Sequence, residues 1–148
     1  MCDPTKFATR YVEVFNDKLG VSAVAEQDGD VHATLDNGLR LCVVNTAPSD
    51  PEVLRIYTSF KTDLPKPALD ATIATVNRNM VGAKLFAPAD DFFVVTVQMV
   101  VAGRDCLPTS DHLAAVLPRA ISMIISAVAE FNTELTLLGI AEATENAA

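Results

Sequence analysis

Cys106 and His112 are the two residues of this sequence that most readily suggest a catalytic group. With Asp105 and Asp111 beside them, a thiol nucleophile, an imidazole base and an orienting carboxylate can be drawn. A Cys and a His six residues apart at the start of a helix match no catalytic arrangement that we can identify, and such trios arise by chance in many sequences. Asp111 is better explained as a negative charge in the first turn of a helix, where the macrodipole favours it. The sequence therefore predicts no catalytic residue, and we expect the protein not to be an enzyme.

The other polar residues also fit structural positions better than ligand sites. His32 alternates with Val31 and Ala33, which places its imidazole on the solvent side of a strand. The Asp-rich segments lack the alternating acidic pattern and the downstream Glu of a calcium loop. The glycines are isolated, so they form neither a phosphate-cradling loop nor a dinucleotide fingerprint. We therefore expect neither a metal ion nor a cofactor.

The cysteine content indicates a reducing compartment. The chain has three cysteines, an odd number, and they are widely spaced without a C-x-x-C pair. Neither a disulfide framework nor a zinc site can be built from such a set. The N-terminus lacks a basic region followed by an apolar run, and the longest apolar stretch, Phe92 to Gly103, is interrupted by Thr96 and Gln98. Since a bilayer span needs about 20 apolar residues, we expect a cytoplasmic protein without a membrane partner.

Composition and charge favour a folded, acidic protein that does not bind nucleic acid. Half of the 148 residues are hydrophobic and 20% are charged, so a core can form. Nineteen Asp and Glu against eleven Lys and Arg give a formal charge of −8, which disfavours the neutralisation of phosphates. The basic, aromatic surface of a single-strand binder is also not expected, because no run of Lys or Arg is interleaved with the strand aromatics Tyr57, Phe60, Phe92 and Phe93.

The elements that must position these residues follow from the periodicity of the apolar side chains. Asp3 and Pro4 are start signals for a first helix, which is expected to end near Gly20. From Val21 to Phe60 the period changes to two, and Asp-Gly and Asn-Gly turns predict an antiparallel meander. The expected strands are Val21–Ala25, Val31–Leu35, Leu39–Val43 and Val53–Phe60.

A second helix and two further strands follow the meander. The second of these strands, Phe92–Ala102, is apolar on both faces, which is typical of a strand inside a sheet. A final helix is capped by Ser110 or Thr109 and reaches about Leu138. A kink or a break is expected at Pro118, because proline lacks the amide and clashes with the preceding turn.

The order of the elements predicts an α+β fold, α-β-β-β-(β)-α-β-β-α, in which helices pack on one face of an antiparallel sheet in two layers. Residues 1–138 are expected to form a single domain. The Ala- and Glu-rich residues 139–148 are expected to form a flexible tail. No internal repeat indicates a second unit.

The final helix is apolar over most of its circumference. A helix that packs on a sheet on one side only needs an apolar stripe somewhat wider than ~100°. At roughly 25 cal/mol per Å2, several exposed apolar side chains cost several kcal/mol, so something must cover the rest. Either another part of the same domain or a dimer or partner interface supplies this cover. The residues expected to be buried by the core or by such an interface are Ile121, Ile124, Ile125 and Val128.

Three consecutive segments form a distinctive series: Ala74–Asn79, then Ala83–Phe86, then the hydrophobic strand Phe92–Val97. This series resembles the YbjN family of small bacterial proteins, described as sensory transduction regulators, in which an Asn-rich helix end is followed by a Lys and a buried strand. The resemblance extends from about Phe7 to Leu135. An aromatic residue often precedes the second Asn in that family, whereas Arg78 stands there in this chain.

The resemblance implies a fold similar to that of type III secretion chaperones. Such proteins are commonly dimeric, bind segments of other proteins and catalyse nothing. They use helix and sheet surfaces to hold a partner chain in extended form. By this analogy of fold, we expect a homodimer with an unidentified polypeptide partner and a chaperone-like or regulatory role.

Two other interpretations remain open. A small-molecule sensor or minor enzyme would have a pocket between helix and sheet, near Asn77, Cys106 and His112. A self-contained monomer would serve as an adaptor. Asn77 also has a structural explanation, because its carboxamide lies beside an apolar stripe near Val81-Gly82 and can cap backbone groups there.

Overall fold

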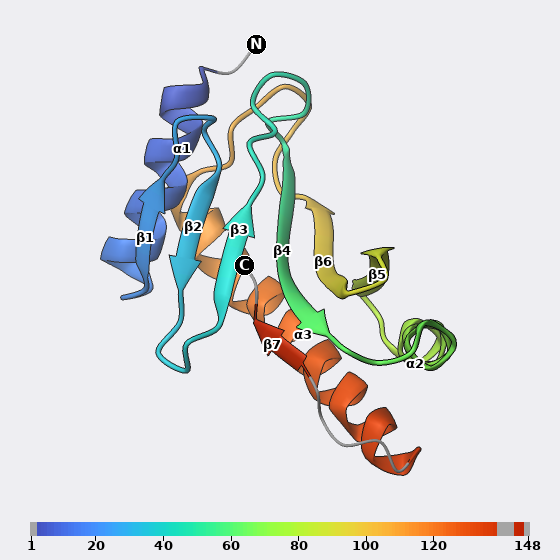
Figure 1. Cartoon of the computed structure of the whole chain (residues 1–148). Helices are drawn as coiled ribbons and strands as arrows, with labels where there is room; N and C mark the ends of the chain where they lie inside the picture. The colour runs from blue at the N-terminus through green and yellow to red at the C-terminus, as the bar shows by residue number, and fades with distance from the viewer. Residues whose placement is uncertain (1–2, 139–143, 147–148) are drawn as a thin grey trace.

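The computed structural model describes residues 3–138 and 144–146, and it shows helices packed on one face of an antiparallel sheet (Figure 1). The sheet order is β1-β2-β3-β4-β6-β5, and β7 pairs with β4 off this path. The helical segments are α1 (Pro4–Glu13), the π-helical turn η1 (Val14–Lys18), α2 (Lys66–Asn79) and α3 (Ser110–Leu137). The strands are β1 (Ser22–Ala25), β2 (Val31–Thr34), β3 (Arg40–Val43), β4 (Val53–Thr62), β5 (Ala83–Ala89), β6 (Phe92–Val100) and β7 (Thr144–Asn146). The predicted α+β class and element order are confirmed.

The first helix begins where the sequence predicts. The Asp3 carboxylate accepts a hydrogen bond from the Thr5 amide at 2.8 Å, which caps the helix ahead of Pro4. The helix continues through η1, which ends at Lys18, and Gly20 follows the C-cap with a φ of +64° that glycine readily adopts. Its apolar face is fully buried, and it includes the ring pair of Phe7 and Tyr11.

The meander also forms as expected, because its two tight turns contain glycines at positive φ. Gly29 has a φ of +88° and Gly38 a φ of +86°. The longest ladder joins β4 to β6, with Val53 opposite Val100 and Lys61 opposite Phe92 at its ends. Strand β6 lies between β4 and β5, so the interior position predicted for it is confirmed.

The core lies between the sheet and the helices. Phe93 of β6 is 1% exposed, and its ring stacks on Phe60 at 5.4 Å and on Phe131 of α3 at 4.3 Å between centroids. In Figure 1, α1 and α3 lie behind the sheet, while α2 lies at its β5 end and contacts α3. We call the side of the sheet on which α1 and α3 pack the covered face.

Helix α3 runs without a break from Ser110 through Pro118 to Leu137, so of the expected kink or break at the proline no break occurs. Leu113, Leu117 and Ile121, on both sides of the proline, are all buried in the core. By length and composition alone, α3 is also long and apolar enough to cross a bilayer. Eight side chains of α3 are buried against the rest of the fold, and most of the others are partly or fully exposed.

The predicted flexible tail, 139–148, lies mostly outside the described residues. Within it, the structure places β7, which pairs antiparallel with β4 from Phe60 to Thr62. This pairing begins beyond the stretch of β4 that β3 occupies, where Cys42 and Val43 oppose Tyr57 and Ile56. Strands β3 and β7 therefore pair with the same edge of β4, and β7 occupies the part of that edge that β3 does not reach.

Candidate interaction surfaces

The structure divides the residues predicted for an interface between two environments. Ile121 is 9% exposed and Ile124 is fully buried, so both belong to the core of the single chain. Ile125 is 41% exposed, and Val128 is half-buried at the edge of the core. The cover that the sequence required is therefore supplied within the chain by the sheet, α2, η1 and α1, and of the four predicted residues Ile125 and Val128 remain available to a partner.

Ile125 contributes to two hollows that flank it along α3. One, of about 320 Å3, is lined by Leu19, Val21, Leu35, Pro118, Ile121, Ser122 and Ile125. The other, of about 270 Å3, is lined by Asn37, Gly38, Leu39, Phe60, Ile125 and Val128. Together they form an apolar depression between α3 and the ends of β1 to β3, which we call the α3 groove.

Asn77 has a structural role at the edge of the sheet. Its Nδ2 donates to the Leu85 carbonyl at 2.8 Å, and its Oδ1 accepts from the Leu85 amide at 2.7 Å. The carboxamide thus connects α2 to β5. Its backbone partner is Leu85, a few residues beyond the turn at Val81-Gly82 where the sequence predicted the contact. Both polar atoms of the side chain are used in this contact, so Asn77 is not free to bind a ligand.

A second asparagine makes the same contact at the opposite edge. Asn16 Oδ1 accepts from the Ala23 amide at 2.9 Å, and its Nδ2 donates to the Ala23 carbonyl at 3.3 Å. β1 and β5 are the two edge strands, so each edge has backbone groups covered by a helix-borne carboxamide. This blocks positions at which another strand could pair. The sequence indicated only Asn77, although Asn16 has an equivalent place just before a helix-ending Gly.

The residues drawn as a catalytic trio do not form one. Asp111 makes an ion pair with Lys18 at 2.9 Å, which lowers the pKa of this exposed carboxyl. It lies in the first turn of α3, the position predicted for it. Cys106 and His112 are both exposed, and the His112 amide donates to the Thr109 hydroxyl that caps the helix. The pocket suggested near Asn77, Cys106 and His112 is therefore not supported by their surroundings.

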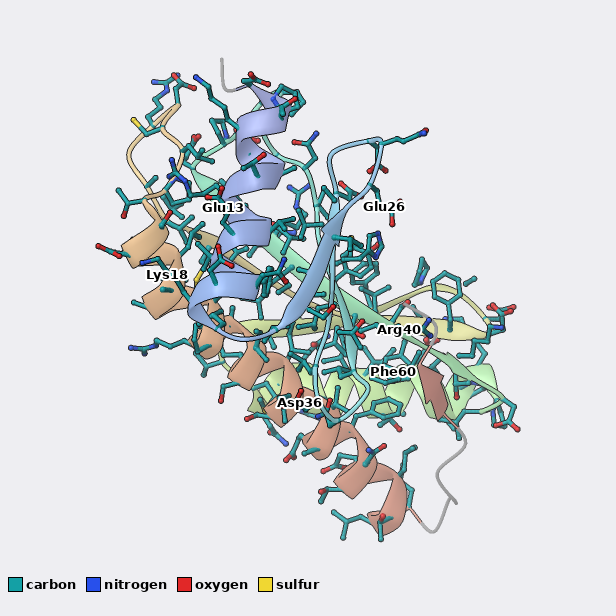
Figure 2. All side chains as sticks on the ribbon, turned by 90° about the vertical axis from the view of Figure 1, so that its left-hand side faces the viewer. Glu13, Lys18, Glu26, Asp36, Arg40 and Phe60 are labelled. Atoms are coloured by element: carbon teal, nitrogen blue, oxygen red, sulfur yellow. The ribbon has the colours of Figure 1, made fainter. Side chains whose placement is uncertain are left out.

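An acidic cleft separates α1 from the β1–β2 turn. Its volume is about 380 Å3, and Glu13 and Glu26, both labelled in Figure 2, lie on its two sides. Among the described residues, no group of three or more His, Cys, Asp and Glu side chains is placed to hold a metal ion. The cleft therefore shows no donor set for a cation.

The side of the sheet away from the helices is the open face, and it bears the second set of alternating side chains. Arg40 lies on this side in Figure 2, away from α1 and α3. The ladders align His32, Cys42, Tyr57, Thr96 and Lys84 in one row across the sheet. A second row holds Ser59, Val94 and Phe86.

A shallow cavity of about 380 Å3 lies on the open face over β4, β6 and β5. It is lined by Val44, Arg55, Tyr57, Ser59, Phe86, Phe92, Val94, Thr96 and Gln98. Phe86 is 43% exposed, and Val100, on the same face, is 73% exposed. The cavity therefore combines exposed apolar groups with hydroxyl, amide and guanidinium donors.

The charged residues of the open face come from separate strands. Strands β1 to β6 contain four basic residues, Arg40, Arg55, Lys61 and Lys84, and no Asp or Glu. All four alternate with the inward residues of their strands, so they share the face that carries Tyr57, Phe86 and Phe92. These basic residues form no contiguous run in the sequence, and their only local signal is the alternation of Arg55, Tyr57 and Lys61 along one strand.

The centre of the open face is less polar than its rim. Cys42 is 1% exposed, and burial raises the pKa of its thiol to about 11. Burial, together with the Cys42 hydrogen bond, raises the pKa of the Tyr57 hydroxyl to about 12. Both groups are therefore neutral near pH 7, and the thiol is a poor nucleophile there. His32 is half-buried beside Cys42, on the strand face predicted for it.

Comparison with known proteins shows the fold. No family profile matches the chain. No curated protein matches it either. Among solved structures, the chain is similar to the crystal structure of YbjN from E. coli, described as a candidate transcription regulator, with a TM-score of 0.59 and 15% sequence identity. The match covers 85% of this chain and 92% of that one, so the predicted resemblance to YbjN is confirmed at the level of the fold.

Proposed function

We propose that the protein is a non-catalytic binding module that holds an extended segment of a partner polypeptide on the open face of its sheet. One observation carries the proposal: aromatic and apolar side chains gather on a sheet face that no described helix covers. Monomeric proteins rarely leave such patches exposed without a binding role. The role would be chaperone-like or regulatory, as expected from the resemblance to the YbjN family.

The edge strands are poorly suited to pair with a partner strand, which favours binding on the face of the sheet. Strand addition needs unpaired backbone groups at an edge. Asn16 and Asn77 occupy such groups on Ala23 and Leu85. A partner segment would therefore be held by side-chain contacts in the cavity over β4, β6 and β5.

The proposal extends to a homodimer formed through the α3 groove in the cytoplasm. Ile125 and Val128 present apolar surface there, and a self-complementary apolar patch is the usual basis of a two-fold interface. Free Cys42 and Cys106 suit a reducing compartment. A solution mass near twice 15.8 kDa at micromolar concentration is expected from light scattering.

The variant that tests this interface is Ile125→Asp, which should reduce the mass to that of a monomer while the circular dichroism spectrum is unchanged. Ile124→Asp is unsuitable, because Ile124 is fully buried and a charge there would unfold the chain. A wild-type mass near 15.8 kDa would contradict the dimer and leave the binding role to the monomer.

Peptide selection tests the binding role. Short random peptides displayed on phage would be selected on the wild-type protein, and binders would be titrated against Phe92→Ser and Ile125→Ser. Phe92 lines the open-face cavity and Ile125 the α3 groove. Binders should lose at least about tenfold in affinity, about 1.4 kcal/mol, on the first variant only. Binders that depend on Ile125 alone, or no binders at all, would contradict the proposal.

A further inference from the structure

We propose that the segment held on the open face is acidic, with apolar or aromatic residues between its carboxylates. This inference rests on the proposed function and adds the chemistry of the partner. Its basis is the charge of the sheet, which is opposite to that of the rest of the chain. Strands β1 to β6 contain four of the eleven Lys and Arg and none of the nineteen Asp and Glu.

The basic residues surround the apolar part of the cavity. Arg55 lies opposite Gln98, Lys84 opposite Thr96 and Lys61 opposite Phe92. The rows of Lys61 and Arg55 are six residues apart along β4, which is about 20 Å at ~3.3 Å per residue. An extended segment of about six residues covers this distance, and alternate side chains of such a segment face the sheet.

Arg55 has unsatisfied hydrogen-bonding capacity. It is half-buried, and its Nε is buried without a hydrogen-bond partner. The ion pairs found among the described residues join Lys18 to Asp111 and Lys66 to Asp70, so Arg55, Lys61 and Lys84 have no carboxylate partner in this part of the chain. A guanidinium binds a carboxylate through two parallel hydrogen bonds. A Glu or Asp of a bound segment would satisfy Arg55 in this way.

The apolar groups require more of the partner than charge. Phe86 and Phe92 lie at one end of the cavity, and Val94, 7% exposed, forms part of its floor. Aromatic or aliphatic side chains bury the most apolar area in such a depression. A segment with acidic residues alone would leave this apolar surface exposed to water. The partner segment therefore alternates acidic and apolar residues.

The surrounding charge favours a short acidic peptide over a nucleic acid. Outside β1 to β6 the chain has seven Lys and Arg against nineteen Asp and Glu. A polynucleotide that continued beyond the cavity would carry a phosphate at each nucleotide into this acidic surface. A peptide of about six residues that lies along β4 and β6 stays near Arg55, Lys61 and Lys84, and the carboxylates nearest to it, Asp28 and Asp30, lie on the β3 side of Tyr57. The open face therefore fits an acidic peptide better.

Fluorescence anisotropy with three synthetic peptides tests the inference. The peptides alternate Phe with Glu, Gln or Lys and are otherwise identical, and labelled oligo(dT) is the nucleic-acid probe. The Glu peptide should bind at least about tenfold more tightly than the Gln peptide, a difference of about 1.4 kcal/mol, and the Lys peptide should bind most weakly. Raising the salt concentration should weaken the Glu peptide selectively.

Charge variants locate the effect. Arg55→Gln with Lys84→Gln should weaken the Glu peptide about tenfold and leave the Gln peptide within about twofold. Arg119→Gln with Arg78→Gln is the matched control, because it removes the same charge from exposed positions on α3 and α2. This control should change neither affinity more than about twofold. Circular dichroism spectra would verify the fold of both double variants.

The outcomes separate this inference from the proposed function. Equal binding of the Glu and Gln peptides, with no effect of Arg55→Gln, would overturn the acidic partner and leave a peptide-binding face. Binding of oligo(dT) but of no peptide, lost in the same variant, would overturn both proposals in favour of a nucleic acid. Absence of binding by every probe and every selected peptide would also overturn both.

Discussion

The covered and open faces of the sheet are made of the same strands and differ in the exposure and the charge of their side chains. Along β4 the covered face presents Leu54, Ile56 and Phe60, all at most 8% exposed, whereas Arg55 and Tyr57 alternate with them on the open face. Within β1 to β6 the covered face has no charged residue and the open face has only basic ones, while Asp30 from the β1–β2 turn lies beside Cys42 at 3.9 Å. One face therefore stabilises the fold, and the other is the face on which we propose recognition.

The largest effect should come from the aromatic stack of the covered face. Phe93→Ala removes the ring between Phe60 and Phe131 and should lower the free energy of unfolding by about 3–5 kcal/mol, as for other buried Phe to Ala changes. Urea unfolding followed by circular dichroism measures the difference. Phe92→Ala, one residue away on the open face, is the control and should cost less than about 1 kcal/mol. Equal losses would contradict the distinction between the faces.

An intermediate effect is expected where the covered face meets the edge of the sheet. Asn77→Ala leaves the amide and carbonyl of Leu85 without their partners and should lower the free energy of unfolding by about 1–3 kcal/mol. Amide hydrogen exchange should also become faster at Leu85. Asn79→Ala, at an exposed position of the same helix, should change neither measurement. A stable Asn77→Ala protein with a protected Leu85 would show that the contact is dispensable.

An effect that is absent near neutral pH should appear at high pH on the open face. Burial raises the pKa of Cys42 from 9.0 to about 11 and that of Tyr57 from 10.0 to about 12. Since the folded protein holds these protons more tightly than the unfolded chain, their contribution is complete below about pH 9 and is lost as pH rises through 11 and 12. The free energy of unfolding should therefore decrease over this range.

Cys42→Ser should make that decrease shallower, and urea unfolding between pH 8 and about pH 11 measures it. Cys106→Ser is the control, because it removes a thiol that is exposed to solvent in the folded protein. Identical slopes in the wild type and Cys42→Ser would show that the open face does not shield the thiol from water.

Much of the fold could be predicted from local pattern. The alternation in β4 and β6, the Asp3 cap and the turn glycines follow from backbone geometry that depends on a few neighbouring residues. The span of α3 was also predicted, but the sequence could not say whether Pro118 interrupts it, because the penalty of proline is local while the burial of Leu117 and Ile121 involves distant segments. Local sequence patterns therefore predict where helices and strands lie better than whether a residue such as Pro118 interrupts one.

The candidate sites were predicted less completely. Asn77 was indicated by its place beside an apolar stripe, whereas Asn16 and the cavity over β4, β6 and β5 were missed. Periodicity also could not divide Ile124 from Ile125, since both belong to an apolar helix surface and only the position of the sheet decides which is buried. A basic surface contributed by separate strands leaves no contiguous run in the sequence.

The sequence by itself determined which side chains of each strand share a face, because successive residues of a strand point to opposite sides whatever surrounds them. It also determined the α+β class through the order of its periods. Only the tertiary structure decided that the face of Arg55 and Tyr57 stays open and that Phe86 and Phe92 join them there. The register between β4, β6 and β5 depends on packing across segments separated by α2, and local periodicity carries no information about that packing.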